Sequence, residues 1–282
     1  VAGPYRQALR KKAQKLKKCN IEVKMKVLLH IIYNEFVKVL LDFRRIVRVA
    51  NKEGLCDYTY KLKLKLAHTA PWGHFRPSDL VADSYDRIGD KYAEWTSQVQ
   101  RNARDECIST LLQELPAGSK LLDLGCGTGI PTTKRLSKHF KVTGVDISGA
   151  CINRAQQNVP NGKFIHGDMT ALDFLRDSFD AIIACYSIFH LPRSEHQKLL
   201  KSIAYWLRPG GLVAATMGGH STKATFKSDW FGTSMYWSSF DGRVNRKLFE
   251  VVGLRVICAQ SSTEEVFGNS IDFVWVIAKK PD

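Results

Sequence analysis

Short apolar runs alternate with helical patterns throughout residues 78–282. Seven runs have the length and composition of buried strands: Lys120–Leu124, Lys141–Val145, Lys163–His166, Phe179–Cys185, Gly211–Thr216, Arg255–Gln260 and Phe273–Ala278. Apolar residues at helical spacing predict helices over Ser84–Trp95 and Asp105–Leu115. Because strands that alternate with helices build parallel sheets covered on both faces, the pattern predicts a doubly wound α/β fold.

The connection between the last two predicted strands differs from the others. It consists of Ser261–Asp272 alone and contains Gly268, Asn269 and Ser270. A parallel crossover needs a connection of about a dozen residues or more, usually a helix, whereas an antiparallel pair needs only a turn. We therefore expect a mostly parallel, seven-stranded, Rossmann-like sheet whose last strand is antiparallel.

The beginning of the chain differs from the rest in charge and pattern. The first 76 residues contain 18 Lys and Arg against 5 Asp and Glu, whereas the remainder contains 24 against 22. Lys26–Arg48 has the spacing of a basic amphipathic helix, Lys61–Leu66 alternates like a strand, and Pro71–Pro77 is typical of a linker. Such a segment either meets an anionic membrane or RNA, or is a partly disordered or non-native extension. We expect a basic extension over residues 1–77, followed by one compact domain.

Composition limits the remaining possibilities. No run of about 18 apolar residues is present to span a bilayer, and the contents of 44% hydrophobic and 24% charged residues are those of folded soluble domains. The seven cysteines are scattered without a C-x-x-C pair, which argues against a disulfide framework and against a zinc site. We expect no metal and a reducing, cytoplasmic setting.

A glycine-rich turn follows the first predicted strand directly. The strand ends at Leu124 and continues into Gly125-Cys126-Gly127-Thr128-Gly129. Glycines allow positive φ and close approach of a ligand, and a strand that opens into a helix at this edge is a common nucleotide site. The dinucleotide pattern G-x-G-x-x-G would need glycine at position 130, where Ile130 stands. The turn therefore indicates a cofactor site and disfavours a nicotinamide dehydrogenase.

Three aspartates stand in register with this turn. Asp146 follows the second strand, 21 residues after Gly125, where a carboxylate can accept hydrogen bonds from both ribose hydroxyls. Asp168 follows the third strand, from which it could reach an adenine amino group, and Asp123 would supply negative charge near a cationic part of the cofactor. Each aspartate taken alone is as consistent with a loop turn or a helix cap. Their common order along the chain favours a binding site.

Together these motifs resemble the class I S-adenosylmethionine-dependent methyltransferase superfamily over roughly Ser84–Pro281. Phe179–Ile183 is similar to the family's fourth strand, Trp206–Leu212 to the turn before its fifth, and Tyr85–Tyr92 to the helix that covers the methionine end of the cofactor. The resemblance implies strand order 3-2-1-4-5-7-6 and S-adenosyl-L-methionine as cofactor. The cofactor contacts that it implies are Tyr85, Tyr92, Asp123, Gly125, Cys126, Gly127, Gly129, Asp146, Ile147, Asp168, Met169 and Cys185.

The residues after the fourth predicted strand are candidates for the chemistry. His190 lies where acceptor and cofactor should meet and is the candidate catalytic base; the alternative is a structural histidine bonded to a loop carbonyl. The aromatic-rich segment Asp229–Phe240 either walls a pocket for a flat or hydrophobic acceptor or packs as core. It resembles segments of small-molecule methyltransferases broadly akin to the quinone C-methyltransferase group. The candidate acceptor contacts are Tyr186, Trp230, Tyr236 and Trp237.

The sequence motifs that identify several methyltransferase classes are absent from this chain. Cys185-Tyr186-Ser187-Ile188 stands where enzymes of exocyclic nucleic-acid amines carry Asn/Asp-Pro-Pro-aromatic. No Pro-Cys dipeptide is present, and no pair of closely spaced glutamates follows the fourth strand. A small-molecule acceptor is therefore favoured. Two alternatives stay open: an RNA methyltransferase that uses the basic first 76 residues, and a non-catalytic cofactor-binding subunit.

Deletion of residues 1–76 should leave cofactor binding and small-molecule methylation largely intact. Every cofactor motif lies after Ser78, and about 200 residues suffice for a domain with its own core. The measurement compares cofactor affinity and turnover of the truncated and full chains. If activity on a small acceptor is lost, or is lost on RNA alone with a steep salt dependence, the extension is part of the enzyme.

Overall fold

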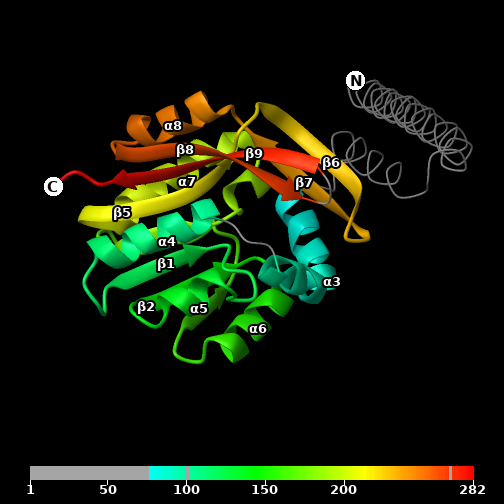
Figure 1. The fold of residues 1–282 in the computed structure, drawn as a ribbon, viewed down its shortest axis with the longest axis horizontal. Coiled ribbons are helices and arrows are strands. Elements are labelled where there is room, and N and C mark those ends of the chain that lie inside the picture. The colour runs from blue at the N-terminus through cyan, green and yellow to red at the C-terminus, as the bar shows by residue number, and fades with distance from the viewer. Residues whose placement is uncertain (1–75, 99–101, 267–268) are drawn as a thin grey trace, which may run out of the picture. The chain divides into compact units, whose positions relative to one another are not determined.

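The computed structural model describes residues 76–98, 102–266 and 269–282 (Figure 1). The helix predicted over Lys26–Arg48 and the strand predicted over Lys61–Leu66 lie outside the described residues. The same holds for residues 71–75 of the linker predicted over Pro71–Pro77. Residues 77 and 78 both belong to the first described helix, α3 (Pro77–Gln98), and the division of the chain into an extension and a domain stays a prediction.

Seven strands form one sheet in the order β3-β2-β1-β4-β5-β9-β8. They are β1 Lys120–Leu124, β2 Lys141–Asp146, β3 Lys163–His166, β4 Phe179–Ala184, β5 Leu207–Gly218, β8 Arg255–Val266 and β9 Asn269–Lys279. The first five pair in parallel, whereas β9 is antiparallel to both β5 and β8. When only these seven strands are numbered along the chain, their order is 3-2-1-4-5-7-6. The expected topology and the antiparallel final pair are therefore confirmed.

The β8–β9 hairpin is longer than its apolar residues predict. Its pairing continues beyond Gln260 to Val266, which lies opposite Asn269. Most side chains of β8 are exposed, because this strand forms the edge of the sheet. An exposed edge strand needs no continuous apolar pattern, so its polar residues are read as loop from sequence alone.

Helices surround the sheet in the described part of the chain. They are α3 Pro77–Gln98, α4 Asn102–Glu114, α5 Thr132–Leu136, α6 Gly149–Asn158, α7 Arg193–Trp206 and α8 Gly242–Val251, together with the 3-10 turn η1 Ile188–His190. α3 and α4 confirm the two predicted helices with shifted ends. Pro77 begins α3 instead of ending the linker, because proline at the first helical position loses no hydrogen bond. Within the described ranges, no helix has both the length and the apolar character that crossing a membrane requires.

Successive residues of the central strands face two separate cores. Leu122 and Leu124 of β1 pack with α7 and α8 on one face, and Leu121 packs with α4 on the other. All three side chains are fully buried. Because side chains of a strand alternate between faces, a strand that is apolar throughout needs helices on both sides. The central strands are therefore apolar at nearly every position because helices cover both faces of the sheet.

A separate hairpin, β6 Thr222–Trp230 and β7 Thr233–Ser239, packs against α3. It contains the predicted aromatic-rich segment, and part of that segment is core, since Trp230 and Tyr236 are both buried. The apolar pattern does not predict β7, because Met235 and Tyr236 are buried in succession and the strand lacks alternation. The missed signal is a two-residue turn with positive φ at both positions, typical of hairpins.

Candidate functional site

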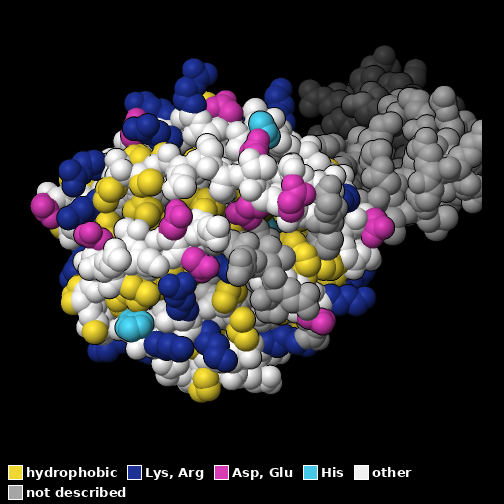
Figure 2. Space-filling view, viewed as in Figure 1, with side chains coloured by type: hydrophobic (Ala, Val, Ile, Leu, Met, Phe, Trp, Pro, Cys, Tyr) yellow, Lys and Arg dark blue, Asp and Glu magenta, His cyan; other side chains and the backbone are white. Residues whose placement is uncertain are grey.

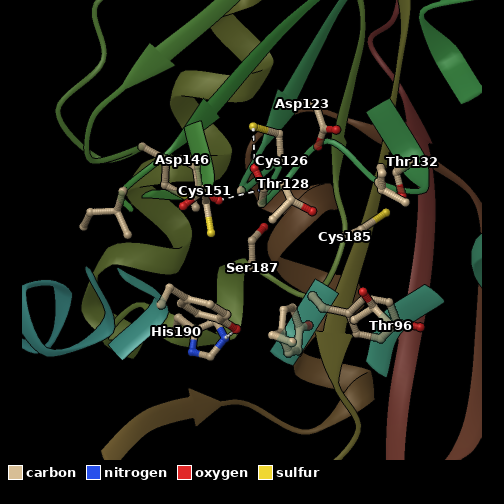
Figure 3. Close-up of a pocket in the computed structure, with 18 of the residues that line it drawn as sticks. Thr96, Asp123, Cys126, Thr128, Thr132, Asp146, Cys151, Cys185, Ser187 and His190 are labelled. Carbon is tan, nitrogen blue, oxygen red and sulfur yellow. Dashed lines mark hydrogen bonds between the residues drawn. The ribbon is translucent and has the colours of Figure 1, made fainter. Parts of the chain in front are cut away.

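A cavity opens at the carboxyl ends of β1, β2 and β4 and is bordered by α3. Figure 3 shows Asp123 and Asp146 at one end of this first cavity and His190 at the other, with Ser187 between them. Most of the predicted site residues line it: Tyr85, Tyr92, Asp123, Gly125, Cys126, Gly127, Asp146, Ile147, Met169, Cys185, Tyr186 and His190. The fold thus brings together residues that are up to about a hundred positions apart in sequence.

The glycine turn needs glycine at its first two positions for different reasons. Gly125 has φ of 78°, and a Cβ there would lie 2.3 Å from the Cβ of Ser187, so no larger residue fits. Gly127 has φ of 54°, and a Cβ there would meet no atom within 4 Å. Gly125 therefore permits close packing of β1 on β4, while the backbone of Gly127 faces open space that a ligand can enter.

Asp146 ties the end of β2 to the glycine turn. Its Oδ2 accepts a hydrogen bond from the backbone N–H of Gly127 at 2.8 Å, and its Oδ1 accepts one from Ser148 at 2.9 Å. Burial raises the pKa of Asp146, and these two bonds oppose the shift. Each carboxylate oxygen has a second lone pair, so the group still has capacity to accept hydroxyl donors from the cavity.

Asp123 and Arg104 place opposite charges in the same cavity. Asp123 is 1% exposed and accepts a hydrogen bond from the Thr133 hydroxyl at 2.6 Å; burial raises its pKa to about 7. Arg104 is 7% exposed, and the Asp105 Oδ1 atom lies 4.0 Å from its Nε. Among the described residues, no acceptor is within hydrogen-bond distance of Arg104 Nε. A buried guanidinium in that position is suited to an anionic ligand.

Asp168 and Gly129 lie outside the lining of the first cavity. Asp168 Oδ1 accepts hydrogen bonds from the backbone N–H and the hydroxyl of Thr170, at 2.8 and 2.7 Å. This is the turn-capping arrangement that the sequence left open for each aspartate. Gly129 has φ of 78° and donates its N–H to the carbonyl of Cys126, which closes the turn. Met169, beside Asp168, does line the cavity.

His190 is held by one hydrogen bond at each ring nitrogen. Its Nδ1 lies 2.9 Å from the Tyr236 carbonyl oxygen, and its Nε2 lies 3.0 Å from the Tyr85 hydroxyl. Because a carbonyl only accepts, the neutral ring carries its proton on Nδ1, and Nε2 accepts from Tyr85. Burial lowers the pKa of His190 to about 4 and raises that of Tyr85 well above its ordinary value. The carbonyl bond of a structural histidine is present, and Nε2 keeps a lone pair at the cavity wall.

A second cavity, of about 360 Å³, shares a wall with the first. The residues that line both cavities are Tyr85, Tyr92, Tyr186 and His190. Its volume falls within the range of small-molecule sites, about 300–1,000 Å³. The arrangement allows one ligand in each cavity, with the two ligands meeting at the shared wall.

Three of the four candidate acceptor contacts line this second cavity, namely Tyr186, Trp230 and Trp237. The prediction for the fourth, Tyr236, is not met by its side chain, which is 3% exposed and packs 4.8 Å from the ring of Phe226. Neighbouring residues of a strand point to opposite faces, so Trp237 faces the cavity and Tyr236 faces away. Tyr236 contributes through its main-chain carbonyl instead.

Sequence reasoning missed three residues that shape the site. Arg104 belongs to a helix whose polar positions look solvent-exposed in sequence, and its burial depends on the tertiary fold. Asp86 Oδ1 accepts hydrogen bonds from the Ser148 hydroxyl at 2.6 Å and from the Ala150 N–H at 3.1 Å, which fastens α3 over the cavity. Ser187 donates to the Leu124 carbonyl at 2.7 Å. No local sequence pattern predicts these long-range contacts.

Comparison with known proteins matches residues 121–211 to the family described as "Methyltransferase domain". A trans-aconitate 2-methyltransferase of Deinococcus radiodurans is 32% identical over 142 residues, which cover 49% of this chain and 52% of that protein. A demethylmenaquinone methyltransferase of Staphylococcus haemolyticus is 25% identical over 158 residues, which cover 52% and 61%. In both cases the chain spans less than two thirds of the curated relative.

Among solved structures, the chain is similar to the N-methyltransferase NodS of Bradyrhizobium japonicum, determined in complex with S-adenosyl-L-homocysteine. The TM-score is 0.59 at 16% identity, and the match covers 72% of this chain and 100% of NodS. At that identity the likeness concerns the fold alone.

Gly125→Ala should destabilise the ligand-free protein more than Gly127→Ala. Both substitutions force alanine into left-handed backbone at a cost of about 1–2 kcal/mol, but only Gly125→Ala also collides with Ser187, which adds about 1–3 kcal/mol. Urea unfolding of both variants measures the difference. Equal losses of unfolding free energy would contradict the close packing of β1 on β4.

Proposed function

We propose, on the premise that the chain carries a methyltransferase domain of the class I S-adenosylmethionine-dependent superfamily, that it transfers a methyl group from S-adenosylmethionine to a small-molecule acceptor. The first cavity would hold the cofactor and the second the acceptor. The observation that carries this proposal is the presence of buried Asp123 and buried Arg104 in one cavity that Asp146 also lines.

The charges of the first cavity fit an α-amino acid group attached to a nucleoside. Asp123 is suited to the ammonium end of the cofactor, and Arg104 to its carboxylate. Asp146, fixed by Gly127 and Ser148, is placed to accept the ribose hydroxyls. A nicotinamide dinucleotide has no amino acid group, so this pair would serve no purpose for it. Gly129 and Asp168 stay proposed cofactor residues on the family resemblance alone, since neither lines the cavity.

Methyl transfer requires an acceptor atom aligned with the methyl group and shielded from water. The bound cofactor supplies an activated methyl group on a sulfonium. Positioning of the reactants lowers the activation free energy by up to about 7–11 kcal/mol in well-oriented intramolecular models. Residues that orient the two ligands would therefore provide most of the rate enhancement. Tyr85, Tyr92 and Tyr186 line both cavities and would orient both ligands at their junction.

His190 is the proposed base for acceptors that lose a proton. Its pKa of about 4 keeps it neutral at physiological pH, with the Nε2 lone pair at the shared wall, where it accepts the Tyr85 hydroxyl. An acceptor hydroxyl that displaces the Tyr85 hydroxyl from Nε2 would pass its proton to this nitrogen. A base with so low a pKa is weak, so His190 suits a moderately acidic proton such as that of a phenol.

The charge of the domain favours a small acceptor over RNA. After residue 76 the chain has 24 Lys and Arg against 22 Asp and Glu. Figure 2 shows acidic and basic side chains both spread over the visible face of the described part. Nucleic-acid enzymes gather cations along the path of the phosphates. RNA methylation would therefore depend on residues 1–76, and it stays the alternative.

The test is incubation of the full chain with labelled S-adenosylmethionine and a cell extract, followed by untargeted detection of labelled products. We expect label in the small-molecule fraction. Label confined to RNA, with transfer that falls steeply as salt rises, would support the RNA alternative. Normal cofactor binding with no labelled product across a broad panel of acceptors would support a non-catalytic subunit.

Asp146→Ala should weaken cofactor binding by about 1.5–3 kcal/mol, the worth of hydrogen bonds to a charged group. It should also lower stability, because the N–H groups of Gly127 and Ser148 lose their acceptor. Asp180→Ala is the matched control: Asp180 accepts from the Lys120 N–H at 2.6 Å, at the opposite end of the sheet. Calorimetry should show weaker cofactor binding for Asp146→Ala alone. Equal cofactor affinities in the two variants would remove Asp146 from the site.

Cofactor affinity should rise with pH up to about 7 and then level off. Burial raises the pKa of free Asp123 to about 7, and a bound ammonium group favours its ionised form, so binding below that pH releases a proton. The slope should not exceed about tenfold per pH unit. Calorimetry between about pH 5.5 and 7.5, in buffers of different ionisation enthalpy, measures the proton release. The same slope in Asp123→Asn would show that another group is responsible.

A further inference from the structure

Two sets of aromatic rings line the second cavity, which we call the slot. One set comes from α3, β6 and β7 and consists of Tyr85, Tyr92, Trp230 and Trp237, whose neighbouring rings lie 5.3 to 5.7 Å apart. The other set consists of Tyr186, which follows β4, Phe189 of η1 and Phe273 of β9, with centroids 5.3 to 5.7 Å apart. Most neighbouring rings stand edge to face, so the lining offers both ring faces and ring edges to a ligand, which favours a planar, conjugated one.

Most polar groups of this slot are already engaged with the protein. The Tyr186 hydroxyl donates to Glu264 at 2.7 Å, and the Ser238 hydroxyl donates to the Leu191 carbonyl at 2.6 Å. Asp272 is bonded to His220 at 2.8 Å and to Thr263 at 2.6 Å. The two acidic groups near the slot, Glu264 and Asp272, therefore already accept hydrogen bonds from the protein.

Lys227 differs from His220, the other basic side chain that lines the slot alone and that lies 2.8 Å from Asp272. Lys227 is exposed on β6 and lines the second cavity, and within the described residues no carboxylate lies within 4.0 Å of its ammonium group. The slot therefore combines an aromatic lining with a cation that has no carboxylate partner in the described part of the chain. A planar ligand with an anionic group complements both features.

The position of Lys227 also separates recognition from chemistry. Lys227 lines the second cavity alone, whereas His190 lines both. The methyl group has to cross the wall that the two cavities share, and Lys227 is not part of that wall. An anionic group of the acceptor held at Lys227 would therefore anchor the ligand, while another of its atoms faces the shared wall.

We propose that the acceptor is a planar conjugated anion whose charged group pairs with Lys227 and is retained in the product. This rests on the proposed function for the identity of the reaction. The new bond forms between the methyl carbon and another nucleophilic atom of the acceptor at the shared wall, the electron pair of the broken carbon–sulfur bond stays on sulfur, and the proton that the acceptor atom loses passes to His190 Nε2.

The experiment uses the full chain and two isosteric probes, 2-naphthoate and its neutral amide 2-naphthamide. Calorimetry at low salt measures both affinities with and without saturating S-adenosylhomocysteine. We expect 2-naphthoate to bind about five-fold tighter than 2-naphthamide, the upper range for an exposed ion pair. In Lys227→Gln the two affinities should agree within about two-fold. Lys223→Gln, on the same strand but outside the slot, should keep the preference.

Several results would overturn the inference. They are equal affinities for the two probes in the unmodified chain, a preference that survives in Lys227→Gln, tighter binding of a naphthyl trimethylammonium cation, and no binding of either probe. A naphthol carboxylate incubated with S-adenosylmethionine should give a product whose carboxylate is free, and a methyl ester would contradict the remote position of the anion. Failure of the proposed function can be distinguished from failure of this inference. In the first case the chain does not bind S-adenosylhomocysteine, regardless of how the two probes bind.

Discussion

The hydrogen bond from the Gly127 N–H to Asp146 Oδ2 is the contact on which the first cavity depends. It joins the turn after β1 to the end of β2, and the N–H groups of Gly125 and Cys126 reinforce it by donating to the Val145 carbonyl. On the other side the same turn packs against Ser187, which follows β4 and leaves no room for a Cβ at Gly125. The turn therefore takes its shape only when three neighbouring strands are in register. The first cavity is therefore formed only when the sheet is correctly folded.

A second constraint fixes the state of His190. The proton position of its ring is set by the Tyr236 carbonyl of β7, and the Tyr85 hydroxyl of α3 occupies its free nitrogen. α3 is in turn fastened to the start of α6 by Asp86. Thus the elements outside the main sheet determine which nitrogen of His190 carries a lone pair. Burial among them also keeps the ring neutral, because it lowers the pKa to about 4.

Sequence reasoning succeeds for this chain where a local pattern and its structural consequence coincide. The apolar runs predict the central parallel strands, because helices cover both faces of the sheet and most positions of β1, β2 and β4 are buried. The glycine turn and Asp146 are predictable for the same reason, since their spacing follows from consecutive β–α units. The method fails where burial comes from distant contacts. From sequence, Arg104 is expected on the surface of a helix, but it is buried. Tyr236 is expected to line a pocket, but the alternation of side chains along β7 places its ring on the face opposite the cavity.

The two cavities are built by different parts of the fold. The parallel half of the sheet supplies the glycine turn, Asp146 and Asp123, whereas the β6–β7 hairpin and β9 supply much of the second cavity. Side-chain changes in the hairpin can therefore alter the second cavity without disturbing the bond between Gly127 and Asp146. The hairpin acts on His190 through the main-chain carbonyl of Tyr236, and a main-chain acceptor survives replacement of its side chain. The ligand preference of the second cavity can thus vary while the tautomer of His190 stays fixed.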